Sequence, residues 1–364
     1  MTDMIIAFTR GVPPAESFPN EELIECTRQV ISEHSAKILQ YGSAAGYEPL
    51  REYIARQYSV DVEQVVIGQG SLQLLDILCS VSLTEGDSVF VEQPTYDRTL
   101  TIFKRAKAEL RGFRFTTGQI NIEEVKMSLE KGSIPKYFYV IADFQNPSGC
   151  VMGRAERQAL TSLARQYGFM IIEDNPYRRL RYEGIPLPSL FEISPDVVIH
   201  MSSFSKLVSP GLRIGYMILP KNLAEKLIKY AEDTYVCPSF LNQAVVLEFI
   251  ERGMLEKQLK HLISLYRPRL RTILSAMDSR LNGFGEWIKP QGGFYVGLTL
   301  NNNINMLNLN DAAAFRLALS DGRGFFLSGG SHFIRLPFCA LTEGEITMGI
   351  QRLEDVITVS LKEP

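Results

Sequence analysis

The chain has 364 residues, of which 45% are hydrophobic and 22% are charged, and its formal net charge is −3. This composition is typical of a globular protein with a large core, and the length favours either more than one domain or a large domain with a smaller one. The charge is close to neutral and no basic tail or long run of like charges is present, which argues against nucleic-acid binding.

No apolar run is long enough to span a membrane, and the amino-terminal segment MTDMIIAFTRGVPP lacks the features of a signal peptide. The cysteines are odd in number, scattered, and without CxxC spacing: Cys26, Cys79, Cys150, Cys237 and Cys339. This pattern predicts free thiols in a reducing cytoplasm and no metal site.

Short apolar runs alternate along the chain with longer amphipathic stretches. The runs expected to form buried strands are 64–68, 87–94, 136–144, 169–175, 196–203 and 214–220. Helical stretches such as 71–82 and 154–168 lie between them. The alternation predicts a mainly parallel sheet with helices on both faces, and ligands of such sheets bind beyond the carboxyl ends of the strands.

Polar residues stand where the first three of these runs stop. Gly70 and Ser71 open a helix after the first run, so the turn can bind an anion or can be a tight turn with Ser71 as its cap. Tyr96 follows the second run and can stack on a flat ring or simply pack. Asn146 follows the third run in QNPSG, a sequence typical of turns, but it also stands where a ligand would lie.

The later strand ends carry charge. Glu173 and Asp174 end the fourth run, with Tyr177 shortly after. A carboxylate there needs a cationic partner, or Asp174 caps a helix. The fifth run leads into SSFSKLVSPGLR, which holds Ser203, Ser205, Lys206 and Arg213 and is either a phosphate site or a solvated loop.

One ligand uses all of these strand ends together. Pyridoxal 5'-phosphate has a phosphate, a flat ring, a ring oxygen, a basic ring nitrogen and a carbonyl that a lysine can attack. A mononucleotide would explain the phosphate contacts, but it would not require both Lys206 and Asp174.

The joint occurrence of SFSK with an arginine seven residues after the lysine, of DNPY and of NPSG resembles the class I/II aminotransferases of pyridoxal-phosphate fold type I. The similarity is strongest to the aminoadipate/kynurenine-type branch and to the aminotransferase-like domains of GntR-type regulators. It runs nearly end to end, through FTRGVPPAESFP (8–19), YGSAAGYEPLREYIA (41–55) and FIRLPF (333–338).

The resemblance implies an α/β fold with a mainly parallel central sheet, helices on both faces and a smaller α/β domain. The large cofactor-binding domain is expected over 41–261, and the small domain over 1–40 and 262–364. A homodimer with shared active sites is also implied.

The resemblance further implies the roles of individual residues. Lys206 would form the Schiff base with pyridoxal phosphate and Asp174 would pair with the ring nitrogen. Tyr177 and Asn146 would bind the ring hydroxyl oxygen, Asn146 would also border the substrate, and Tyr96 would stack on the ring. The phosphate cup would consist of Gly70, Ser71, Leu72, Ser203, Ser205 and Arg213, although many relatives carry glutamine in place of Leu72.

Three further residues complete the expected site. Tyr41 would reach the phosphate of the neighbouring subunit, and Arg335 would bind the substrate α-carboxylate, unless it forms a surface ion pair. Arg10 stands where the aminoadipate-type branch often has glycine. It either contacts the substrate side chain, or points to solvent or pairs with Glu16.

The implied activity is a pyridoxal-phosphate-dependent aminotransferase of cytoplasmic amino acid metabolism. It would move an amino group between an L-amino acid and a 2-oxo acid, with glutamate and 2-oxoglutarate as one pair. A lyase or decarboxylase would use the same lysine, aspartate and arginine and remains an alternative. The ligand-sensing part of a regulator is disfavoured, because the aminotransferase-like segment begins by about Phe8 and leaves no room for a winged-helix domain.

Overall fold

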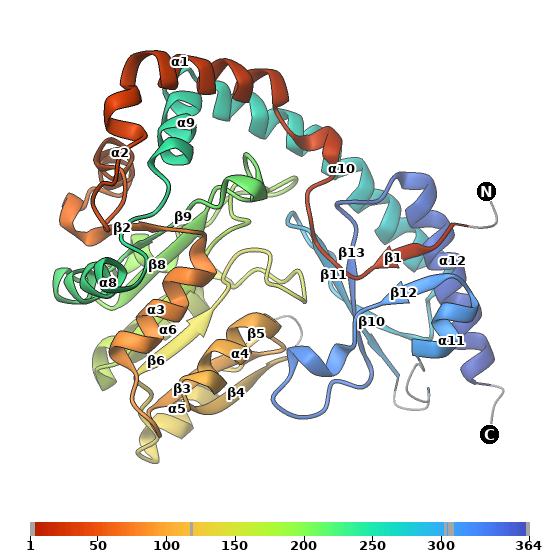
Figure 1. Cartoon of the computed structure of the whole chain (residues 1–364). Helices are drawn as coiled ribbons and strands as arrows, with labels where there is room; N and C mark the ends of the chain where they lie inside the picture. Colours follow the sequence, from red (N-terminus) through yellow and green to blue (C-terminus); the bar gives the residue numbers. More distant parts are fainter. Residues whose placement is uncertain (1–3, 117–118, 302–303, 305–308, 362–364) are drawn as a thin grey trace.

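The computed structural model describes residues 4–116, 119–301, 304 and 309–361. It consists of a larger α/β body and a smaller one, and the long helix α10 (Met254–Arg280) runs from the first to the second (Figure 1). Both ends of the chain lie at the smaller body. None of the helices among the described residues is long and apolar enough to cross a membrane.

The larger body contains a mainly parallel sheet, as the sequence predicts. Across the sheet the strands are β2 (Val65–Gly68), β9 (Gly215–Ile218), β8 (Val198–Ser203), β7 (Met170–Asp174), β6 (Tyr137–Val140), β3 (Ser88–Gln93), β4 (Glu109–Thr116) and β5 (Gln119–Ile120). Strands β8, β7, β6, β3 and β4 run parallel, whereas β9 is antiparallel to both of its neighbours and β5 is antiparallel to β4.

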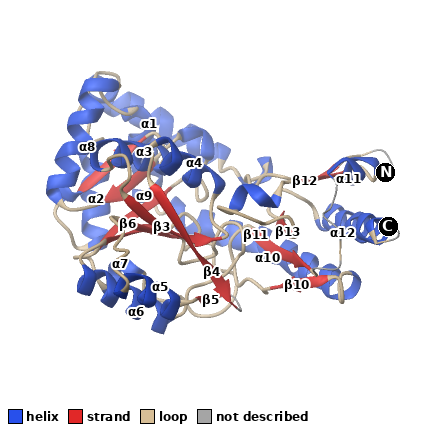
Figure 2. Ribbon diagram, turned by 90° about the horizontal axis from the view of Figure 1, so that it is seen from below, coloured by secondary structure: helices blue, strands red, loops and turns tan. Residues whose placement is uncertain are grey.

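Helices cover both faces of this sheet (Figure 2), because alternate strand residues are apolar on both sides. On one face the core includes Val66, Val89, Tyr139 and Ile172 together with residues of α3 (Ser71–Ser82), α4 (Asp97–Arg105) and α8 (Lys221–Thr234). The opposite core includes residues of α1 (Asn20–Ile38), α2 (Glu48–Tyr58), α5 (Ile122–Glu130), α6 (Arg154–Tyr167), α7 (Leu190–Ile193) and α9 (Phe240–Glu251).

The smaller body has two small sheets. Strand β1 (Ile6–Phe8) pairs in parallel with β12 (Leu317–Leu319), and β11 (Tyr295–Leu300) pairs antiparallel with β10 (Gly285–Trp287) and β13 (Phe333–Pro337). The helices α11 (Leu309–Ala314) and α12 (Glu343–Ser360) complete it. Single turns of 3₁₀-helix occur at Ala15–Ser17, Val62–Gln64, Pro210–Leu212 and Gly322–Phe325.

The amino-terminal segment touches both bodies. Its strand β1 belongs to the smaller one through β12, whereas its helix α1 contacts α9 of the larger one. The domain boundaries at residues 41 and 261 therefore stay a prediction. All five cysteines are free, as expected.

Candidate active site

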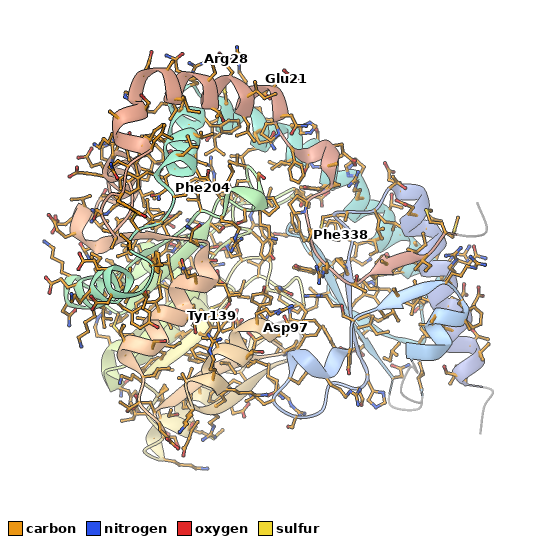
Figure 3. The ribbon with its side chains drawn as sticks, in the orientation of Figure 1. Glu21, Arg28, Asp97, Tyr139, Phe204 and Phe338 are labelled. Carbon is orange, nitrogen blue, oxygen red and sulfur yellow. The ribbon has the colours of Figure 1, made fainter. Side chains whose placement is uncertain are left out.

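A cavity of about 610 Å³ lies at the carboxyl ends of the parallel strands. Every predicted site residue except Tyr41 lines it: Arg10, Gly70, Ser71, Leu72, Tyr96, Asn146, Asp174, Tyr177, Ser203, Ser205, Lys206, Arg213 and Arg335. They come from both bodies of the molecule, and Figure 3 shows Asp97, another lining residue, close to the boundary between them.

A larger cavity of about 740 Å³ lies between α2, α10 and the segment after β7. Its wall contains Tyr58, Arg178, His200 and Arg267 but neither Lys206 nor Asp174. Size alone therefore does not identify the active site. The smaller cavity is the candidate, because it gathers the nucleophile, the acid and the anion-binding groups.

Lys206 lies just after β8 and its amine is held inside the cavity wall. Nζ donates a hydrogen bond to the carbonyl of Gly11 at 3.3 Å and lies 5.7 Å from the centre of the Phe294 ring. Burial lowers the pKa of this ammonium, and the nearby Arg213 and Arg335 lower it further. A lysine in these surroundings is readily uncharged, as a nucleophile must be.

Asp174 ends β7 and is 5% exposed. Its Oδ2 accepts a hydrogen bond of 2.7 Å from the hydroxyl of Tyr139, whereas Oδ1 is buried without a hydrogen-bond partner among the described residues. Burial raises the pKa of this carboxyl to about 7. An unpartnered buried carboxylate oxygen calls for a cationic or N–H donor from a ligand.

The amino terminus of α3 offers an anion site. Gly70 precedes the helix with a φ of 92° and makes no side-chain cap, so the first amides of α3 are free of a capping side chain. A Cβ at Gly70 would lie 2.3 Å from Nη2 of Arg213, so the glycine allows the guanidinium to lie beside these amides. Backbone amides, helix dipole and guanidinium together favour a phosphate.

The segment after β8 completes this anion site. The Oγ of Ser203 lies 2.9 Å from that of Ser205 and 3.0 Å from the carbonyl of Ile214. Arg213 has a φ of 56° and donates to the carbonyl of Gln69 at 2.8 Å. The predicted phosphate cup is therefore assembled in one place.

Arg335 on β13 is 8% exposed and pairs with no carboxylate among the described residues. Its Nη1 donates to Oδ1 of Asn146 at 3.1 Å and its Nη2 to the carbonyl of Thr9 at 2.7 Å. The guanidinium also lies 4.5 Å from the centre of the Phe325 ring, and its Nε has no partner. The alternative of a surface ion pair is wrong, and a buried guanidinium of this kind favours an anionic ligand.

Aromatic residues border the same space. Tyr96 precedes α4 at the cavity wall, and the hydroxyl of Tyr177 lies 3.2 Å from that of Tyr295. Sequence reasoning missed several wall residues: Thr9, Gly11, Ser320 and Tyr295, together with Tyr139 behind Asp174. Thr9 and Gly11 lie within FTRGVPPAESFP, which signalled the family but no role for these two residues, and the other three lie in segments without a motif.

Arg10 is exposed at the cavity wall. The alternative that it pairs with Glu16 is wrong, because Glu16 instead pairs with Arg269 of α10. Leu72, where many relatives carry glutamine, lies in the first turn of α3 and lines the cavity. Tyr41 is 78% exposed and does not line the cavity of its own chain.

The donor set fits pyridoxal phosphate. A buried lysine meets the carbonyl, the free amides and Arg213 meet the phosphate, and the unpartnered Oδ1 of Asp174 meets a protonated ring nitrogen. When bound, the cofactor supplies a ring that withdraws electrons from the α-carbon of an amino acid.

Comparison with known proteins agrees with this geometry. The family model of class I and II aminotransferases matches residues 4–353. The chain is 34% identical to the aromatic-amino-acid aminotransferase 1 of Thermococcus litoralis, over 100% of this chain and 90% of that protein.

Solved structures show the same fold. A multiple substrate aminotransferase from Thermococcus profundus has a TM-score of 0.94 at 31% identity, over 100% of this chain and 93% of that one. An α-aminoadipate aminotransferase from Thermus thermophilus, complexed with N-(5'-phosphopyridoxyl)-L-leucine, has a TM-score of 0.92 at 29% identity, over 98% and 93%. The chain belongs to the class I and II aminotransferases of fold type I, and it is a pyridoxal-phosphate-dependent aminotransferase.

Proposed function

We propose that this aminotransferase uses glutamate and 2-oxoglutarate as one of its pairs of amino donor and acceptor. The observation that carries the proposal is Arg10, which lines the active-site cavity and has no acidic partner among the described residues. The second carboxylate of a dicarboxylic substrate would form an ion pair with this guanidinium.

The charges around the cavity support this assignment. Arg213 lies at the anion site beside α3, and Arg335 is suited to the substrate α-carboxylate. Arg98 has its own acidic neighbour, since its Nε lies 3.9 Å from Oδ2 of Asp97. Of the described arginines that line the cavity, Arg10 is the one that remains, and a distal carboxylate would neutralise it.

The roles of the cofactor residues form part of the proposal. Lys206 would hold the cofactor through its amine, and that amine would move the proton at the substrate α-carbon. The lowering of its pKa by burial supports both tasks, because each requires an uncharged amine. Asp174 would keep the ring nitrogen protonated, Tyr177 and Asn146 would bind the ring oxygen, and Tyr96 would stack on the ring.

The test measures the rate of a single-turnover amino transfer from glutamate and from leucine, monitored by the change in cofactor absorbance. Arg10→Gly should slow the reaction with glutamate by about 10- to 100-fold, because a charge-assisted contact is lost, and should leave leucine unchanged. Arg98→Gln is the matched control: it also removes a guanidinium from the cavity wall, but one that already has an acidic neighbour.

Equal losses with both donors would make Arg10 a residue without a role in substrate choice. A parent enzyme that accepts no amino group from glutamate would contradict the proposed couple itself.

We also propose a homodimer and a cytoplasmic location. The exposure of Tyr41 supports the first, since a tyrosine that lies outside its own cavity is available to a second subunit. The five free cysteines are consistent with a reducing compartment.

A further inference from the structure

Behind the candidate cofactor site, the hydroxyl of Tyr139 binds Asp174. Tyr139 lies on β6, next to β7, and its side chain points to the same face of the sheet as Asp174. It has no exposed surface and lies inside the larger body (Figure 3). Its hydroxyl donates to Oδ2 of Asp174 at 2.7 Å, and this is the only hydrogen bond that the carboxylate makes within the described residues.

Other ionisable groups near Asp174 do not offer a hydrogen bond. Glu173 is bound on the opposite face of the sheet by His200 and by the amides of Leu190 and Phe191. Glu92 on β3 is bound by the amide of Ile141 and by the side chain of Gln145. Tyr96 and Tyr177 lie close enough to Asp174 for its negative charge to contribute to raising their pKa values, but among the described residues neither donates a hydrogen bond to it.

The phenol of Tyr139 is a donor of fixed direction. Burial raises its pKa well above 10, and the negative charge of Asp174 raises it further, so the hydroxyl keeps its proton. With Oδ2 occupied by this bond, Oδ1 is the oxygen left for a ligand. A hydrogen bond to a carboxylate is stronger than one to the neutral acid, so the phenol favours the ionised form.

We propose that Tyr139 is a positioning residue that favours the ionised form of Asp174 and directs its Oδ1 to the ring nitrogen of the cofactor. The inference rests on the proposed pairing of Asp174 with that nitrogen. Tyr139 itself touches neither cofactor nor substrate, and it acts by making protonation of the ring nitrogen favourable.

The experiment measures how tightly the cofactor-free protein binds two ligands, pyridoxal phosphate and its 1-deaza analogue, in which a C–H group replaces the ring nitrogen. Tyr139→Phe keeps the ring and the packing and removes only the hydroxyl. At a pH about one unit below the pKa of about 7 of Asp174, the cofactor-free protein holds this acid neutral, and binding ionises it.

Tyr139→Phe should then weaken binding of pyridoxal phosphate by about tenfold, the difference between a hydrogen bond to a charged and to a neutral acceptor. Binding of the deaza analogue should be nearly unchanged, because this ligand has no nitrogen to protonate and Asp174 stays neutral. If the Tyr139 hydroxyl served only packing, its removal would weaken the binding of both ligands equally.

Tyr137→Phe is the matched control. Tyr137 lies on the same face of β6, is buried, and donates to Oγ of Ser82 at 2.9 Å, away from Asp174. This variant should change neither affinity.

Different results would contradict the proposed role of Asp174 and the inference about Tyr139. If Asp174→Asn does not reduce the preference for pyridoxal phosphate over its deaza analogue, the proposed role of Asp174 is wrong. If Asp174→Asn abolishes that preference and Tyr139→Phe leaves it intact, Asp174 keeps its role and the inference about Tyr139 is overturned.

Discussion

Glu92 shows how the burial of one carboxyl makes the free energy of unfolding depend on pH. Its side chain has no exposed surface, Oε2 accepts from the amide of Ile141 at 3.0 Å, and Oε1 has no partner among the described residues. Burial raises the pKa of this carboxyl to about 8. The folded protein therefore holds a proton there at a pH where the unfolded chain has lost it.

Since Glu92 keeps its proton in the folded state and loses it in the unfolded chain between about pH 4.5 and about pH 8, its contribution to the free energy of unfolding falls as the pH rises through this range. The contribution of Glu92 amounts to roughly 5 kcal/mol over the full range. Glu92→Gln should remove that part of the slope, as measured by urea unfolding of the cofactor-free protein across the range. Glu109→Gln, at an exposed position on the neighbouring β4, is the control and should keep the parental slope. A parental slope in Glu92→Gln would show that Glu92 is ionised in the folded state.

Individual site residues differ in how well the sequence predicts them. Lys206 and Asp174 follow apolar strands, where a charge needs a reason, and the structure brings both to one cavity. Tyr139 and Tyr295 lie within strands, where an aromatic residue normally belongs to the core. Tyr139 contacts Asp174 across neighbouring strands and Tyr295 contacts Tyr177 from the other body, so only the fold reveals these contacts.

At the scale of elements, the six predicted apolar runs each contain a strand of the large sheet, whereas β4 and β5 at its edge match no predicted run, and strand ends follow from local contacts. The run 136–144 forms a strand only to Val140, because the amide of Ile141 binds the side chain of Glu92 in place of a neighbouring strand. The run 214–220 forms β9, which is antiparallel to β8. The link from β8 to β9 holds only a short 3₁₀ turn, and a parallel return would need a longer crossover.

The close approach of β9 to α3 is the feature of these elements that positions the anion site. A Cβ at Gly215 would lie 2.1 Å from the amide nitrogen of Ser71 and 2.5 Å from the carbonyl carbon of Gly70. Both are backbone atoms, so Gly215→Ala must displace the start of α3. It should weaken binding of inorganic phosphate and of pyridoxal phosphate by about tenfold or more and lower the stability by about 1–3 kcal/mol.

Gly211→Ala is the control in the same segment, because its Cβ would meet only Oγ of Ser209 at 3.6 Å. Phosphate affinity and thermal unfolding, measured on both variants, separate the two positions. Equal behaviour of the two variants would contradict a positioning role for the contact between β9 and α3.

At the scale of the molecule, the cavity depends on both bodies of the chain. Arg335 of the smaller body donates to Asn146 of the larger one, and the carbonyls of Thr9 and Gly11 bind Arg335 and Lys206. The chain length favoured more than one domain or a large domain with a smaller one, and the resemblance predicted an α/β small domain built from both ends of the chain. Contacts between the ends of the chain, such as β1 with β12, have no local signal in the sequence.

The proposed homodimer leads to a test in which two impaired variants complement each other in a mixed dimer. Tyr41 is 78% exposed and lies outside its own cavity, so we expect its hydroxyl to bind the cofactor phosphate of the partner subunit. Lys206→Ala should abolish activity, and Tyr41→Ala should weaken pyridoxal phosphate binding by about tenfold or more, as expected for a lost hydrogen bond to a charged group.

In a hybrid dimer of these two variants, one site combines the intact Lys206 of one chain with the intact Tyr41 of the other, and the second site lacks both. Mixing the variants after dissociation should therefore restore a fraction of parental activity, assayed at a cofactor concentration that saturates the parent but not Tyr41→Ala. If Tyr41 instead serves its own chain, every site in the mixture lacks one of the two residues and no activity returns. Sedimentation of the parent is the control for the oligomeric state, since a monomeric but fully active parent would exclude the shared site altogether.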